Sequence, residues 1–311
     1  DETLPLYALL KATIVASAND ADVALAEYIA GSYDAFIERM NNRAAELGMT
    51  NTRFANSTGL PTDIPQYSTA RDVAAMAAEL IKHPTFFEYS TIWFENLTEA
   101  RNNTEIANTN KLVRDYQGCD GIKTGYTDAA GHCLAATAKK GNTRYISVVL
   151  GAPGSSERFS ESAMLLDYGF SHFETVKVMN DGTMVQTEIP VKNGKEEFIN
   201  GLVQGEKYIL RPLTHEPQLE KQVTITSDVE APVQEGQQIG ELVFVLDGES
   251  VGKLPIVADR SIEKAGFWDY MDKILDNWMG YPRKVNKNSV QNSPEITPES
   301  TPEETPREGA E

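Results

Sequence analysis

The chain has 311 residues, which is enough for one large domain and a smaller one. Its 46 Asp and Glu residues outnumber its 28 Lys and Arg residues, and the net charge of −18 disfavours nucleic acid as a partner. No apolar run approaches the roughly 18 residues of a membrane-spanning helix. Two cysteines and four scattered histidines offer neither a disulfide scaffold nor a zinc site.

Leu- and Ala-rich segments, separated by capping residues, predict that the first third of the chain is helical. The expected helices cover residues 4–15, 22–30, 33–47 and 70–83. Ser32 is the expected N-cap of the third helix, and Gly48 is the residue expected to end it. Ser17 and Asn19 lie at the junction of the first two helices, where both residue types are good caps.

The pattern changes to short strands after residue 91. The expected strands are residues 121–126, 132–138 and 145–150, and a helix is expected over residues 155–169. The first two strands are expected to form a hairpin, and the third is almost wholly apolar, which predicts a central strand. Cys133 is expected opposite Thr124, with Cys119 too far along its strand for a disulfide. Helices followed by such a sheet indicate an α+β fold.

From about residue 176 to residue 259 the pattern is all-β. The expected strands are residues 184–191, 197–202, 207–210, 222–227, 241–246 and 253–257. Turn-forming pairs such as Asn193-Gly194 lie between them. These features predict a small sandwich or barrel.

Two segments of a different kind follow the predicted strands. Residues 267–279 are expected to form a short helix whose broad apolar face includes Phe267, Trp268 and Trp278. This helix is too short to span a bilayer, so it either lies on a membrane surface or packs against its own domain or a partner. Residues 283–311 are rich in Pro and Glu, which predicts a disordered tail.

Two triplets in the sequence can carry chemistry. Residues 17–19 read Ser-Ala-Asn at the helix junction, and residues 123–125 read Lys-Thr-Gly on a predicted strand. Serine acyl-transfer enzymes of the penicillin-interacting group use S-x-x-K, S-x-N and K-T-G in that chain order. An S-x-N triplet arises easily by chance and is also explained by helix capping, whereas K-T-G is the rarer string.

The surroundings of the triplets add to their weight. The segments concerned are residues 15–21, 40–43 (Met-Asn-Asn-Arg), 56–61 (Asn-Ser-Thr-Gly-Leu-Pro), and 120–127 with 130–131. Together with the triplets they resemble the low-molecular-weight penicillin-binding D-alanyl-D-alanine carboxypeptidases. The small β domain and the amphipathic helix are similar to that family's C-terminal half, so the resemblance covers about residues 1–280. It implies a β-lactamase/transpeptidase-like domain in which helices surround an antiparallel sheet.

The resemblance also implies roles for individual residues. Ser17 and Asn19 would be catalytic residues that transfer protons and position the acyl group. The residues that would bind the substrate's terminal carboxylate are Lys123, Thr124 and Gly125, with Arg158 as a looser match. The implied ligands are peptidoglycan stem peptides as substrate and β-lactams as inhibitors, and neither a metal nor an organic cofactor is implied.

One departure from the family pattern concerns the nucleophile. The S-x-x-K element should stand well before S-x-N, but only 16 residues precede Ser17. The two S-x-x-K strings that the chain contains, residues 250–253 and 261–264, follow K-T-G and are not expected to act. Because the chain begins with Asp1, we expect a mature form or fragment that lacks its N-terminal S-x-x-K part and is inactive alone.

The sequence therefore predicts a serine-type D-Ala-D-Ala carboxypeptidase of the cell envelope, outside the cytoplasm, at the membrane surface or secreted. The expected divisions are a partial catalytic domain over residues 1–174, an all-β domain over 175–262, an amphipathic helix within 263–282 and the tail over 283–311. Two alternatives stay open. A class A-like β-lactamase would use the same triplets, and a non-catalytic penicillin-fold binding protein would need no nucleophile.

Overall fold

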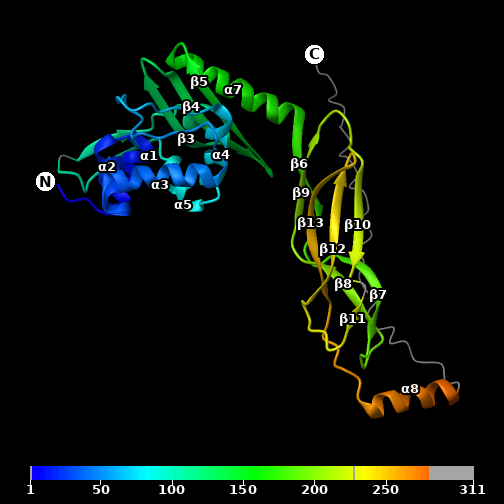
Figure 1. The fold of residues 1–311 in the computed structure, drawn as a ribbon. Coiled ribbons are helices and arrows are strands. Elements are labelled where there is room, and N and C mark those ends of the chain that lie inside the picture. Colours follow the sequence, from blue (N-terminus) through cyan, green and yellow to red (C-terminus); the bar gives the residue numbers. More distant parts are fainter. Residues whose placement is uncertain (1, 102, 227, 280–311) are drawn as a thin grey trace, which may run out of the picture. The chain divides into compact units, whose positions relative to one another are not determined.

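The computed structural model describes residues 2–101, 103–226 and 228–279 (Figure 1). Contacts within the chain divide it into two compact units. Among the described residues, the first comprises those up to 183, 203–224 and 241–255, and the second comprises those in 184–202, 225–240 and 256–279. The predicted tail, residues 283–311, lies outside the described residues.

Helices make up the N-terminal part of the first unit. They are α1 (Leu6–Ala16), α2 (Asn19–Ala30), α3 (Tyr33–Glu46), α4 (Ala70–Leu80) and α5 (Pro84–Ser90). The four predicted helices are confirmed, with ends shifted by a few residues. Ser32 caps α3 as expected, because its hydroxyl accepts a hydrogen bond from the Ala35 amide at 3.2 Å. Helix α5 was not predicted. Pro84 was interpreted only as the end of the preceding helix, but a proline is also favoured in the first turn of a helix, and here it begins α5.

An antiparallel sheet lies between two layers of helices in the first unit (Figure 1). Its strands, in spatial order, and the helix that follows them are β3 (Cys119–Thr127), β4 (Gly131–Lys140), β5 (Thr143–Ala152) and α7 (Ser155–His172). On one face Leu134 belongs to a buried cluster with Leu166 of α7. On the other face Ile122 clusters with Phe86 of α5 and with α4. Helices against both faces of a sheet confirm the α+β fold.

Short elements connect α5 to the sheet. They are the antiparallel pair β1 (Phe94–Leu97) and β2 (Thr104–Ala107), followed by α6 (Leu112–Asp115). None of the three was predicted, because each is only four residues long and carries too little periodicity to be recognised.

The predicted position of the third strand is wrong for the part of the chain that the structure describes. There β5 lies at an edge of the sheet, and β4 is the central strand. Its apolar residues are explained instead by the helices that cover both faces of β5. The Ser147 and Ser162 hydroxyls are 2.5 Å apart, which joins β5 to α7, while Ile146 packs against the cluster formed with α4.

The register of the hairpin also differs from the prediction by one residue. Cys133 pairs with Gly125 instead of Thr124. The reason is a three-residue loop that is closed when the Thr127 hydroxyl accepts a hydrogen bond from the Ala130 amide at 3.0 Å. Both cysteines are free, as expected.

Strands follow α7 up to residue 258. They are β6 (Phe173–Met179), β7 (Met184–Lys192), β8 (Phe198–Val203), β9 (Lys207–Pro212), β10 (Leu219–Ile225), β11 (Val229–Glu230), β12 (Gln238–Leu246) and β13 (Glu249–Ala258). In the first unit β6 pairs with β9, and in the second β7 pairs with β8 and with β11. The predicted all-β C-terminal domain is confirmed.

The last described element is α8 (Phe267–Met279), which belongs to the second unit. Its Tyr270 hydroxyl donates a hydrogen bond to the Asn193 side-chain oxygen at 3.0 Å, and Lys273 Nζ donates to the Gly194 carbonyl at 2.8 Å. Large apolar side chains of α8 are nevertheless exposed, notably Phe267, Trp268, Ile274 and Trp278. None of the described helices has the length and apolar content needed to cross a membrane.

Candidate active site

The junction of α1 and α2 gives Ser17 an unusual backbone. Ser17 ends α1 in the left-handed region, with φ 60° and ψ 40°, and α2 begins at Asn19. A non-glycine residue in this region costs about 1–2 kcal/mol. Such strained residues are concentrated at functional sites. The tight turn places Ser17 and Asn19 on the wall of a cleft.

Strand β3 brings Lys123 to this junction. Lys123 Nζ donates hydrogen bonds to Ser17 Oγ at 2.7 Å and to the Thr124 carbonyl at 3.0 Å. The S-x-N and K-T-G triplets, which are more than 100 residues apart in the sequence, therefore meet. Their predicted juxtaposition is confirmed.

The two triplets line one cleft with a volume of about 600 Å³. Residues of both triplets and of a nearby helix and loop form its wall, among them Ser17, Asn19, Asp22, Ser57, Lys123, Thr124 and Gly125. Lys123 and Ser17 are half-buried, whereas Asn19 and Gly125 are exposed. The cleft is thus open to a ligand along β3 and has a cation in its interior.

Lys123 is an ionisable group in a setting that disfavours its charge. Burial, the largest cause, and the Arg158 charge lower its pKa, Asp22 raises it, and the resulting pKa is about 8. At neutral pH most Lys123 side chains are still protonated. A protonated amine with little water around it binds a carboxylate more strongly than an exposed lysine does.

Arg158, the loosest of the predicted site residues, lies beside the same strand. It comes from the first turn of α7, and its guanidinium donates to the Gly125 carbonyl at 3.1 Å and to the Cys133 carbonyl at 3.4 Å. Burial lowers the pKa of Arg158. Its buried Nε has no hydrogen-bond partner among the described residues. The structure therefore brings all six predicted site residues together.

Sequence reasoning missed two polar residues of the cleft wall, Asp22 and Ser57, and also Tyr33, which contacts Ser57. Asp22 of α2 accepts a hydrogen bond from the Ser57 hydroxyl, and Tyr33 of α3 contacts that hydroxyl at 3.0 Å. Residues 56–61 were noted only as part of the resemblance. No signal in the sequence singled out Asp22, because α2 also contains Asp20 and Glu27.

The rejected S-x-x-K strings have other partners. Lys253 forms an ion pair with Glu241 at 2.7 Å, and Ser261 Oγ accepts a hydrogen bond from the Glu235 amide at 2.9 Å. Within the described residues no three His, Cys, Asp or Glu side chains come close enough together to hold a metal ion.

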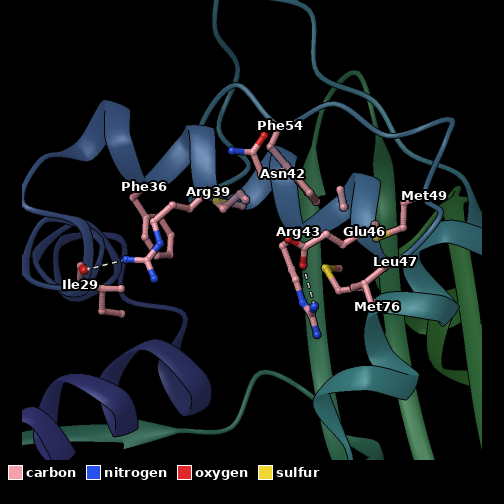
Figure 2. Close-up of a pocket in the computed structure, with 12 residues that line it drawn as sticks. Ile29, Phe36, Arg39, Asn42, Arg43, Glu46, Leu47, Met49, Phe54 and Met76 are labelled. Carbon is pink, nitrogen blue, oxygen red and sulfur yellow. Dashed lines mark hydrogen bonds and ion pairs between the residues drawn. The ribbon is translucent and has the colours of Figure 1, made fainter.

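A second cavity of about 600 Å³ lies against α3 (Figure 2). Its wall is largely apolar, with side chains such as Phe36, Leu47 and Met76. The two arginines at its edge are already engaged. Arg39 donates to the Ile29 carbonyl at 2.9 Å, and Arg43 pairs with Glu46 and Glu79. This cavity contains neither triplet, so it is a weaker candidate.

Comparisons with known proteins agree with the geometry. Residues 1–154 match the family model of D-alanyl-D-alanine carboxypeptidase, peptidase S11. Residues 173–264 match the C-terminal domain of penicillin-binding protein 5. The carboxypeptidase DacF of Bacillus subtilis is 38% identical over 282 residues, which cover 89% of this chain and 71% of the relative.

Solved structures are similar as well. Penicillin-binding protein 5 from Haemophilus influenzae has 32% identity and a TM-score of 0.65, with 82% of this chain and 74% of that chain covered. Penicillin-binding protein D2 from Listeria monocytogenes, in its cefotaxime-bound form, has 35% identity and a TM-score of 0.50, with 55% and 68% covered.

Proposed function

This chain belongs to the D-alanyl-D-alanine carboxypeptidase family of penicillin-binding proteins, and we propose that its cleft binds peptidoglycan stem peptides that end in D-Ala-D-Ala. The reaction is a serine-type hydrolysis that releases the terminal D-alanine through an acyl-enzyme. The observation that carries the proposal is the hydrogen bond between Lys123 and Ser17, because it joins the two triplets in one cleft.

Lys123 and Thr124 would bind the carboxylate of the terminal D-alanine. The ammonium group supplies the charge, and the Thr124 hydroxyl supplies a second donor. Arg158 would add positive charge near Gly125, to whose carbonyl it donates a hydrogen bond at 3.1 Å. Gly125 has no side chain to obstruct a peptide that lies along β3.

Ser17 and Asn19 would act on the scissile end of the peptide. Because the Lys123 ammonium group donates a hydrogen bond to Ser17 Oγ, the Ser17 hydroxyl hydrogen is free to point into the cleft. A hydroxyl placed in this way can pass a proton to the departing D-alanine amine. Asn19 would hold the acyl chain through its amide. In this family pattern the acyl-enzyme would form on the serine of an S-x-x-K element.

β-Lactams carry a carboxylate and would occupy the same cleft, in agreement with the cefotaxime-bound form of the Listeria relative. The site of action would be outside the cytoplasm, on peptidoglycan. The exposed Phe267, Trp268 and Trp278 of α8 would contact the membrane surface there. No observation favours a β-lactamase or a non-catalytic binding protein over this function.

Calorimetry tests the proposal with an N-acylated peptide that ends in D-Ala-D-Ala. The matched control ligand is the same peptide with a C-terminal amide. We expect the acid to bind and the amide to bind at least about tenfold more weakly, because a charge-assisted hydrogen bond is lost. Equal binding of acid and amide, or no binding of the acid, would contradict the proposal.

A further inference from the structure

Asp22 is the acidic residue of the cleft, and neither triplet includes it. It lies in the first turn of α2 and lines the same cleft as Ser17 and Lys123. Its side chain is half-buried. The amino end of a helix stabilises a negative charge. A carboxylate side chain therefore lies on the wall of the cleft that the binding strand β3 also lines.

Hydrogen bonds from two other elements hold Asp22 in place. The Ser57 hydroxyl donates to Asp22 Oδ2. Because that hydroxyl has one hydrogen, the Tyr33 hydroxyl must be the donor in its 3.0 Å contact with Ser57 Oγ. The Tyr33 oxygen in turn accepts the Ser57 amide hydrogen at 3.0 Å. The network joins α2 and α3 to the loop that contains Ser57.

The charged groups around Lys123 come from several elements. Arg158 of α7 is a second cation, and Asp22 of α2 is the anion. Tyr126 of β3 and Cys133 of β4 are the other titratable groups on the wall. Two cations and one anion leave one net positive charge, and a single substrate carboxylate neutralises it. Without Asp22, the remaining influences on Lys123 would be its burial and the like charge of Arg158, and both disfavour its protonated form.

We propose that Asp22 is a positioning residue that keeps Lys123 protonated and thereby sets the pH range over which the cleft binds a carboxylate. The inference rests on the proposed function only in that the ligand is the D-Ala-D-Ala peptide. Asp22 acts through Lys123 and not on the substrate itself. The hydrogen bond from Ser57 holds the Asp22 carboxylate in its position on the cleft wall.

The affinity of the 311-residue chain for the N-acylated D-Ala-D-Ala peptide, measured by calorimetry from pH 6 to pH 10, tests this role. Wild-type affinity should fall as pH rises through about 8, where Lys123 loses its proton. In Asp22→Asn the amide oxygen can still accept the Ser57 hydrogen bond, but the charge is gone. We expect the midpoint of the fall to move to lower pH, because the charge that raises the pKa of Lys123 is gone. At pH 6 this variant should bind no more weakly than the wild type.

Two further variants complete the design. Asp20→Asn removes a charge from the same helical turn but outside the cleft, and it should leave the midpoint unchanged. Asp22→Glu keeps the charge and should restore a midpoint near that of the wild type. Asp22→Ala serves as a second neutral variant if Asp22→Asn does not fold, as judged by circular dichroism.

Each outcome decides one question. An unchanged midpoint in the neutral variants, an equal shift in Asp20→Asn, or failure of both neutral variants to fold would overturn the role of Asp22. A uniform loss of affinity at all pH values would also overturn it, because that result indicates a purely structural residue. If the wild type does not bind the peptide at any pH, the proposed function fails instead.

Discussion

Lys123 is the residue on which the proposed binding depends most. It is half-buried, donates to Ser17, and has a pKa lowered to about 8 by burial. Removing a charged hydrogen-bond donor costs about 1.5–3 kcal/mol. We therefore expect Lys123→Met to weaken binding of the D-Ala-D-Ala peptide roughly 10- to 100-fold at pH 7, measured by calorimetry.

The matched control for this variant is Lys253→Met. Lys253 is an exposed lysine that pairs with Glu241 away from the cleft, and its replacement should change the affinity less than about twofold. Equal losses in Lys123→Met and Lys253→Met, or none in either, would show that Lys123 does not bind the carboxylate.

The backbone conformation of Ser17 gives a prediction about stability. With φ at 60°, alanine at this position keeps the left-handed strain, whereas glycine relieves it. Both substitutions remove the hydroxyl equally. The free energy of unfolding of Ser17→Gly should therefore exceed that of Ser17→Ala by about 1 kcal/mol in urea denaturation. A more stable alanine variant would mean that the junction of α1 and α2 has another conformation in solution.

Helix α8 is the element whose proposed partner is a membrane. Its tryptophans are 76% and 85% exposed, although Tyr270 and Lys273 hold the helix to its own unit. If the exposed face rests on lipid, Trp268→Glu with Trp278→Glu should release the protein in a liposome flotation assay. The control pair, Tyr28→Glu with Met164→Glu, changes exposed apolar residues elsewhere and should still float. Unchanged flotation of the tryptophan variant would contradict membrane contact through α8.

At the element scale, sequence patterns predicted the features that depend on neighbouring residues. They missed the features that depend on how elements pack together. The Ser32 cap and the apolar face of α3 act within one helix, so both could be predicted. The edge position of β5 could not be predicted, because an apolar composition shows that both faces of a strand are covered but not whether other strands pair along both of its sides. The one-residue register error at Cys133 came from the loop closed by Thr127, a side-chain contact that no periodicity contains.

The site was predictable to the extent that its chemistry lies in short strings. Ser17 and Lys123 could be identified as a pair because their triplets have a known order, and the structure joins them at 2.7 Å. Asp22, Tyr33 and Ser57 could not be identified in this way. Their contacts connect segments up to 35 residues apart and depend on how α2, α3 and the following loop fold together.

At the scale of the whole molecule, the prediction is whether the chain reacts covalently with a penicillin. Among the described residues, the lysines of both S-x-x-K strings lie outside the cleft wall, and Lys123 is proposed to bind carboxylate rather than act as a base. We therefore expect a fluorescent penicillin to leave the 311-residue chain unlabelled after denaturing electrophoresis. Penicillin-binding protein 5 of Haemophilus influenzae is the positive control. A labelled band that disappears in Ser17→Ala would show instead that Ser17 and Lys123 are nucleophile and base.

The central claim is that the cleft between the two triplets is the site where the peptide's carboxyl end binds. A crystal structure of the chain with the N-acylated D-Ala-D-Ala peptide tests this claim most directly. We expect the terminal carboxylate within about 3 Å of Lys123 Nζ and the Thr124 hydroxyl, with the scissile bond beside Ser17. A peptide bound elsewhere, for example in the cavity against α3 (Figure 2), with the cleft left empty, would contradict the account.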